Sequence, residues 1–222
     1  MEVFKNLEFE NFKPAWWAPG VHLQTVIASF SKIEYTKTAR RVISTPDNDF
    51  LELEVVDLEN KKPVVVLFHG LEGSSNRYYI QNLMHDLQRI GISSVALNFR
   101  GCGSRINRQQ RMYHSGETSD YFTLFEWVRA NFEGRKILAV GFSLGANALV
   151  KSLAEMGFKH PVSKAVAVSP PYDLKKGSLR MHEGFNRVYE KRFLRTLSEK
   201  ANLKRKQYPD FPIFRGDSVY DF

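Results

Sequence analysis

Short apolar runs alternate with longer runs of helical spacing along this chain from residue 41 onward. Short runs bounded by turn residues predict strands, and apolar residues three or four positions apart predict helices. The predicted order is strands at 41–44, 50–57 and 63–68, a helix at 79–90, a strand at 92–99, a helix at 117–132, a strand at 136–141, a helix at 144–156 and a strand at 164–169. Strand and helix in repeated alternation predict the α/β fold class, with a mostly parallel central sheet and flanking helices.

Two of the strands have patterns that predict their place in the sheet. The run at 50–57 alternates apolar residues with Glu52 and Glu54, which is typical of a strand with one face in water, so we expect it at an edge. The run at 63–68 is continuously apolar and rich in valine, which favours burial on both faces and a central position.

Length and composition are those of one soluble domain. The chain has 222 residues, 43% of them hydrophobic, and Cys102 is its single cysteine. One cysteine excludes an intramolecular disulfide and a cysteine-based zinc site. No run approaches the roughly 20 apolar residues that cross a bilayer, and the acidic start lacks the pattern of an export signal. We therefore expect a cytoplasmic protein.

The positive charge is concentrated in one segment. The formal balance is +8, and the segment 174–207, with 11 Lys and Arg against three Glu, accounts for all of it. Apolar residues recur there every three or four positions from Phe185 to Leu197, which predicts an amphipathic helix. A solvated helical face is the favoured interpretation. An anionic substrate or membrane surface is the second, and nucleic acid is the least favoured.

The motif Gly-Phe-Ser-Leu-Gly at 141–145 follows a predicted strand and begins a predicted helix. A nucleophile elbow needs small residues on both sides of its serine, because the turn that exposes the hydroxyl is strained. The helix after the serine also points backbone N–H groups toward a developing oxyanion. We therefore predict that Ser143 is a nucleophile, with an accidental glycine–serine turn as the alternative.

A second motif, His-Gly-Leu-Glu-Gly at 69–73, follows the predicted central strand. Its glycines allow the backbone to approach a reacting carbonyl, and a loop in this place supplies the other half of an oxyanion hole. The predicted hole consists of the backbone N–H groups of Leu71 and Leu144. His69 ends a buried strand, so we interpret it as a hydrogen-bonded structural residue that holds the loop, with a general base as the less favoured alternative.

These motifs occur in an order that resembles a known family. Besides the two already described, the sequence contains PAWWAPGVHLQTV at 14–26, NFRGCG at 98–103, YHSGETSD at 113–120, AVSPPYDL at 167–174 and GFNRVYEKRFL at 184–194. Together they resemble the YheT-like branch of α/β-hydrolases, which includes the eukaryotic α/β-hydrolase domain-containing proteins of type 1 and type 3.

The resemblance implies the α/β-hydrolase fold and a serine esterase or lipase that acts on short- to medium-chain acyl esters without a cofactor. We expect one domain over 1–222, with an N-terminal extension at 1–40, a core at 41–172 and an incomplete, helical, lid-like segment at 173–222. The family has a Ser, Asp and His triad, of which only Ser143 is carried over to this sequence.

The acid and base of such a triad follow the nucleophile in chain order, on loops after later strands. No histidine of this sequence follows His182, for which we favour a surface or lid position over the role of base. For Asp173, after the strand at 164–169, a helix start or turn is favoured over a catalytic acid. Because a serine without a base is a poor nucleophile at neutral pH, we expect a hydrolase truncated at its C-terminus.

Several further residues have weaker signals. The loop at 100–111 holds four arginines, which we interpret as part of a solvated loop, with a site for an anionic head group as the alternative: Arg100, Arg105, Arg108 and Arg111. Cys102 is interpreted as a passive small residue and not as a thiol of lowered pKa. His22 and His114 are expected to support loops. The sequence has no P-loop, dinucleotide fingerprint or paired metal ligands, so we expect no metal and no cofactor.

Two classes of function stay open. In the first, Ser143 attacks an ester carbonyl of a small-molecule or lipid substrate, and transfer of the acyl group to an alcohol would use the same site. In the second, the chain is a catalytically inactive remnant or binds an acyl ligand without turnover, which the lack of a histidine after His182 favours. The basic segment further suggests peripheral contact with anionic lipid. Nucleic-acid binding is not expected, and the sequence has no signal for an oligomeric state.

Overall fold

The computed structural model of the chain describes residues 13–30 and 32–222. Contacts between residues divide the chain into two compact units, of which the first ends at Ile33 and the second runs from Glu34 to Phe222. The first unit contains the helix α1 (Val21–Ala28). The sheet, the other helices and both catalytic motifs predicted from the sequence lie in the second unit.

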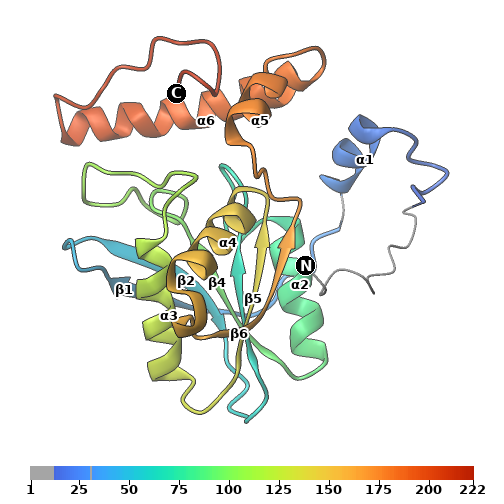
Figure 1. The fold of residues 1–222 in the computed structure, drawn as a ribbon, viewed down its shortest axis with the longest axis vertical. Helices are drawn as coiled ribbons and strands as arrows, with labels where there is room; N and C mark the ends of the chain where they lie inside the picture. The colour runs from blue at the N-terminus through green and yellow to red at the C-terminus, as the bar shows by residue number, and fades with distance from the viewer. Residues whose placement is uncertain (1–12, 31) are drawn as a thin grey trace. The chain divides into compact units, whose positions relative to one another are not determined.

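In the part of the chain that the structure describes, the second unit is built on a six-stranded sheet in the order β1-β2-β4-β3-β5-β6 (Figure 1). Its strands are β1 (Ala39–Ser44), β2 (Phe50–Val56), β3 (Val64–Phe68), β4 (Ser93–Asn98), β5 (Ile137–Phe142) and β6 (Val162–Val168). The pairs β1–β2 and β2–β4 are antiparallel, whereas β4, β3, β5 and β6 run parallel. The predicted α/β class with a mostly parallel sheet is therefore confirmed.

Helices cover both faces of the sheet and continue beyond it. They are α2 (Tyr78–Arg89), α3 (Ser119–Asn131), α4 (Leu144–Met156), the short 3₁₀ helix η1 (Gly157–Lys159), α5 (Leu174–Met181) and α6 (Asn186–Gln207). α2 packs on one face of the sheet, and α3 and α4 pack on the other (Figure 1). The basic stretch is helical as predicted and forms α5 and α6. No helix among the described residues is long and apolar enough to span a bilayer.

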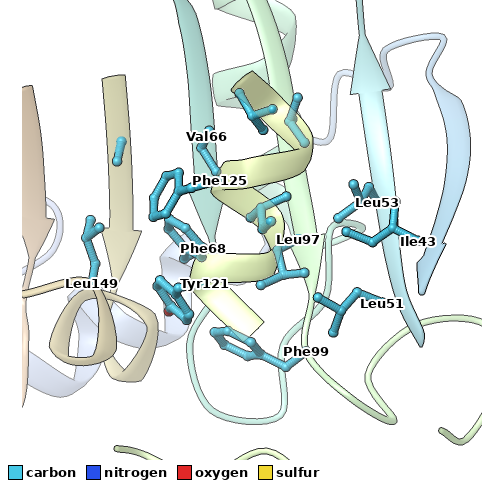
Figure 2. Packing of buried hydrophobic residues seen from close by; sticks show 14 of the residues in the cluster. Ile43, Leu51, Leu53, Val66, Phe68, Leu97, Phe99, Tyr121, Phe125 and Leu149 are labelled. Atoms are coloured by element: carbon cyan, nitrogen blue, oxygen red, sulfur yellow. The ribbon is translucent and has the colours of Figure 1, made fainter. Parts of the chain in front are cut away.

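Phe68, the last residue of β3, lies at the centre of the larger core. Its ring stacks on Tyr121 of α3 with 4.1 Å between ring centroids and meets Phe125 edge-on at 5.9 Å (Figure 2). All three side chains are essentially inaccessible to water. Because full burial of such a side chain contributes about 1.5–3 kcal/mol, this cluster fixes the end of β3, from which the loop with His69 begins.

The predicted edge position of β2 is wrong. β2 lies between β1 and β4 and is buried at every position, Glu52 and Glu54 included. Buried carboxylates need hydrogen-bond partners, and both have them. Glu54 Oε1 accepts from Arg40 Nε at 2.8 Å, and Glu52 Oε2 accepts from the backbone N–H of Ser104 at 2.6 Å. The alternation along β2 therefore marks two chemically different buried faces.

The strand that the sequence places at the centre is where it was predicted. β3 lies between β4 and β5, and every residue from Val64 to Phe68 is buried. The two edges of the sheet are β1 and β6. On β6, Val166 and Val168 are 55% and 37% exposed, so the burial of the sheet decreases from β3 toward this edge.

Candidate active site

Ser143 lies where β5 ends and α4 begins. Its φ of 52° and ψ of −120° are rare for a residue with a side chain and cost conformational free energy. Close packing fixes this turn, because a Cβ on Gly141 would come within 2.6 Å of Ala146 Cα, and a Cβ on Gly145 within 2.3 Å of the His69 carbonyl oxygen. The predicted requirement for small residues on both sides of the serine is confirmed.

The backbone of Ser143 is anchored while its side chain is exposed. Its N–H donates to the carbonyl of Val168 in β6 at 2.9 Å, and its carbonyl accepts from the N–H of Asn147 in α4 at 3.0 Å. Oγ makes no hydrogen bond to any residue that the structure describes. The turn therefore presents a hydroxyl to solvent, with no base beside it among those residues.

The loop after β3 lies against this turn. A Cβ on Gly70 would lie 3.2 Å from Ser143 Cβ and 3.7 Å from its Oγ. The Gly70 carbonyl accepts from His69 Nδ1 at 2.8 Å and from the N–H of Gly73 at 3.0 Å. In a planar trans peptide the C=O and the N–H point in opposite directions, so these two bonds turn the N–H of Leu71 away from the His69 ring.

His69 is fully buried, and both of its ring nitrogens are engaged. Nε2 accepts from the N–H of Phe99 at 3.2 Å, which places the ring proton on Nδ1, the donor to the Gly70 carbonyl. Burial lowers the pKa of His69 to about 3, so the ring is neutral at physiological pH. The predicted structural role is confirmed, since this ring ties the loop after β3 to the end of β4.

The two N–H groups predicted to form an oxyanion hole, those of Leu71 and Leu144, make no hydrogen bond within the described ranges. Leu144 is the first residue of α4, and the first N–H groups of a helix have no partner inside it. A free N–H on each of two adjoining loops, with the positive end of a helix dipole behind one of them, suits the stabilisation of an oxyanion. The oxyanion hole itself stays a prediction.

Asp173 and His182 have partners in their own segment. Asp173 is the N-cap of α5, with Oδ1 accepting from the N–H of Lys176 at 2.9 Å, so the predicted helix-start role is confirmed. His182 lies between α5 and α6, and its Nδ1 is 2.7 Å from Oε2 of Glu190. The other oxygen of that carboxylate accepts from the N–H of Val219 at 2.9 Å. These bonds connect α5, α6 and the residues after α6 to one another.

The interpretation of the arginine loop as solvated is wrong for Arg100. Its side chain is 2% exposed and donates to three carboxylates at 2.7–2.8 Å, those of Asp47, Asp49 and Asp120. A buried cation is stable only with such compensation. Because its donors are occupied inside the protein, the alternative of an anionic head group is wrong for this residue as well.

The other three arginines of this loop are exposed. The guanidinium carbons of Arg105 and Arg108 lie 4.3 and 5.5 Å from the centroid of the Phe50 ring, and Arg111 pairs with nearby carboxylates. Cys102 is buried, and burial raises the pKa of its thiol. The prediction that Cys102 is a passive residue, and not a thiol of lowered pKa, is therefore confirmed.

The sequence also predicted a loop-supporting role for two further histidines, His22 and His114. His114 is exposed and accepts from the N–H of Gly116 at 3.2 Å through Nδ1, which supports its own loop as predicted. His22 belongs to α1 in the first unit.

Two features next to the predicted oxyanion loop were missed by the sequence reasoning. Glu72 has a φ of 52°, and Lys200 of α6 lies 2.8 Å from its carboxylate. Glu72 follows the predicted donor Leu71 directly, and it had no signal in the sequence beyond its place in the motif at 69–73. Lys200 was counted only as part of the basic segment, because a contact between a helix and a distant loop leaves no local sequence pattern.

Residues 63–213 match the family of the alpha/beta hydrolase fold. The chain therefore belongs to the α/β-hydrolase fold family, in agreement with the fold class, the sheet order and the turn at Ser143.

Comparison with curated proteins places the chain near esterases and lipases of the YheT-like branch. It is 39% identical over 193 residues to "Putative esterase YheT" of Escherichia coli, which covers 85% of this chain and 56% of YheT. It is 36% identical over 138 residues to the medium-chain fatty acid ethyl ester synthase/esterase 2 of Saccharomyces cerevisiae, covering 62% of this chain and 30% of that enzyme. It is 25% identical over 227 residues to phospholipase ABHD3 of Bos taurus, covering 96% and 55%.

The predicted family resemblance is thus confirmed, and the chain spans about half or less of the length of these relatives. Among solved structures, the Pyrococcus furiosus esterase Pf2001 matches with a TM-score of 0.55 and 25% identity over 65% of this chain and 56% of its own.

Proposed function

We propose that this chain provides the nucleophile and the oxyanion hole of a serine hydrolase that acts on carboxylic esters. Ser143 is the proposed nucleophile, and the N–H groups of Leu71 and Leu144 are the proposed oxyanion donors. The observation that carries the proposal is the turn at Ser143, where an exposed serine is held at a φ of 52° between the parallel strand β5 and the helix α4. The relatives named as esterases support the same chemistry.

The reaction begins when a base removes the proton of Ser143 Oγ and this oxygen attacks the carbonyl carbon of the ester. The carbonyl oxygen becomes an oxyanion, which the N–H groups of Leu71 and Leu144 stabilise. The alcohol leaves after accepting a proton, the acyl group stays on Ser143, and water then releases the acid. His69 does not serve as base, because its ring is buried and both nitrogens are engaged.

The proposed substrates are short- to medium-chain acyl esters. The names of two relatives, a medium-chain fatty acid ethyl ester synthase/esterase and a phospholipase, support this class. Three exposed cations of α6, Lys191, Arg192 and Arg195, suit an anionic lipid ester or an anionic membrane surface. Reversing their charge should weaken the preference for anionic over neutral esters. An unchanged preference would reject this part of the proposal.

Labelling by a fluorophosphonate, which reacts with activated serines, tests the proposed nucleophile. We expect the folded chain to be labelled, the Ser143→Ala variant to show no labelling, and a matched variant of another serine, Ser178→Ala on α5, to be labelled like the wild type. Loss of labelling only in Ser143→Ala supports the enzyme. A folded wild-type chain that stays unlabelled rejects catalysis by this chain.

A protein that binds an acyl ligand without turnover is the second candidate. The observation that favours this candidate is that the hydroxyl of Ser143 has no hydrogen-bond partner among the described residues. In that case a medium-chain fatty acid should bind to a chain that the phosphonate does not label. If labelling occurs, product analysis with a competing alcohol separates hydrolysis from acyl transfer, since only transfer yields a new ester.

A further inference from the structure

Two lysines, the buried Lys204 and the partly buried Lys200, attach α6 to the loops that follow β4 and β3. Lys204 Nζ donates to the carbonyl of Asn107 at 2.6 Å and also to that of Gln109, and its side chain has no access to water. Lys200 Nζ lies 2.8 Å from Glu72 Oε1, with its side chain 17% exposed. Because a buried ammonium group is costly unless it is paired, these contacts determine where α6 lies.

Glu72 directly follows Leu71, whose N–H is one of the two proposed oxyanion donors. Its φ of 52° is rare for a residue with a side chain and persists only where the surroundings enforce it. Its N–H donates to Tyr113 Oη at 2.9 Å, its carbonyl accepts from Arg77 at 2.8 Å, and its carboxylate accepts from Tyr113 Oη at 2.7 Å. The remaining bond of the carboxylate comes from Lys200, on the lid-like segment.

The ion pair borders a cavity between α6 and the loops that follow β3 and β4. This cavity has a volume of about 360 Å³ and is lined by Ser74, Cys102, Thr196 and Leu203 as well as by the charged pair. Across a cavity the facing side chains lose dispersion contacts. The direct contact of α6 with the Glu72 carboxylate is the ion pair with Lys200.

The ammonium group of Lys200 stays charged at neutral pH. Burial by itself would lower the pKa of Lys200, but the neighbouring Cys102 and Glu72 raise it above its ordinary value. Cys102 Sγ lies 3.0 Å from Nζ. A charged donor makes the bond to the Glu72 carboxylate stronger than a neutral one would be.

We propose that Glu72 and Lys200 are positioning residues that make the direction of the Leu71 N–H depend on the docking of α6. With the pair intact, the loop after β3 keeps the strained conformation in which this N–H is free to meet an oxyanion. Without it, Glu72 relaxes and the donor turns away. This inference rests on the proposed function of Ser143 and Leu71.

Three variants of α6 test the pair by the rate at which a fluorophosphonate labels Ser143. Lys200→Met removes the charge and keeps the length of the side chain, Lys200→Arg keeps the charge, and Lys206→Met is a matched control at an exposed position of the same helix. We expect Lys200→Met to reduce the maximal labelling rate roughly ten- to hundredfold without changing the probe concentration that gives half of it. Lys200→Arg should restore the rate to within about threefold, and Lys206→Met should leave it unchanged.

A second readout does not depend on chemistry at Ser143. Amide hydrogen exchange of the segment 69–77 should become faster in Lys200→Met and in Glu72→Gln, and not in Lys206→Met, with circular dichroism confirming that each variant is folded. Wild-type labelling and exchange in a folded Lys200→Met chain would overturn the inference. A wild-type chain without labelling would reject the proposed function, and the exchange comparison would then decide the pair on its own.

Discussion

Glu72 and Ser143 both have a φ of 52°, the first on the loop after β3 and the second on the turn after β5. Glu72 is 7% exposed, and its N–H, carbonyl and carboxylate all have partners. Ser143 is exposed, and its hydroxyl has no partner in the described part of the chain. A strained residue that is bonded on all sides supports a scaffold, whereas one with a free reactive group is where chemistry is expected.

The two positions also differ in what holds the strain. A left-handed conformation costs roughly 1–2 kcal/mol for a residue with a side chain. At Glu72 the compensation comes from hydrogen bonds and an ion pair of its own side chain. At Ser143 it comes from neighbours, because Gly141 and Gly145 pack so closely that the turn has no other course. The hydroxyl of Ser143 is therefore not needed to hold the turn.

The largest expected effect comes from breaking the packing under the Ser143 turn. In Gly145→Ala the new Cβ meets the carbonyl oxygens of His69 and Phe68, at 2.3 and 2.9 Å, and neither backbone atom can move easily. We expect the free energy of unfolding to fall by about 3 kcal/mol, measured by urea denaturation.

Gly177→Ala on α5 is the control for this substitution, because its Cβ would meet nothing closer than 4.0 Å. It should be neutral or stabilise by up to about 1 kcal/mol, since alanine favours a helix over glycine. Equal losses in the two variants would contradict the account of the turn.

A smaller effect is expected for the pH dependence of stability, which tests the loop after β3. This loop carries Leu71, the other predicted oxyanion donor. The pKa of His69 is about 3 in the folded chain because of burial, while an unfolded histidine binds its proton near pH 6.5. Protons therefore favour the unfolded chain, and stability is lost as the pH falls below about 6.5, at up to about 1.4 kcal/mol per pH unit.

Urea denaturation at pH 7, 6 and 5 measures this loss in the window above the ordinary pKa values of carboxylates. His69→Gln should lose most of the dependence, because glutamine does not titrate, and His160, whose pKa is also lowered by burial, accounts for the remainder. A wild-type stability that stays flat between pH 7 and 5 would show that the ring is not held neutral by burial.

The smallest effect compares the two strained residues directly. Glycine adopts a φ of 52° without penalty, so Ser143→Gly should raise the free energy of unfolding by about 1 kcal/mol, since Oγ gives up no internal bond. Glu72→Gly should lower it by roughly 1–2 kcal/mol, because the lost bonds to Tyr113 and Lys200 outweigh the relief of strain. Changes of the same sign in both variants, measured by thermal or urea unfolding, would remove the distinction between them.

The two loops of the candidate site could be predicted because their signals are local. The glycines at 141 and 145 are required by contacts within a few residues of Ser143 or with the loop after β3, and both motifs follow apolar strands that periodicity identifies. The structural role of His69 also followed from its position at the end of a buried strand.

Other features could not be predicted, because they depend on contacts between distant segments. Lys200 is 128 positions from Glu72, and nothing in the basic pattern of α6 distinguishes it from its exposed neighbours. Alternation in β2 shows that its two faces differ, but the burial of Glu52 and Glu54 depends on partners elsewhere in the fold. Arg100 was taken as solvated for the same reason.

The most direct test of the central claim is to locate a fluorophosphonate adduct by peptide mass spectrometry in the native chain and in the chain unfolded by urea. If the fold activates Ser143, the adduct lies on Ser143 in the native chain and on no serine after unfolding. An unmodified Ser143 in the folded chain, or equal modification in both states, would contradict the claim that this turn makes the serine a nucleophile.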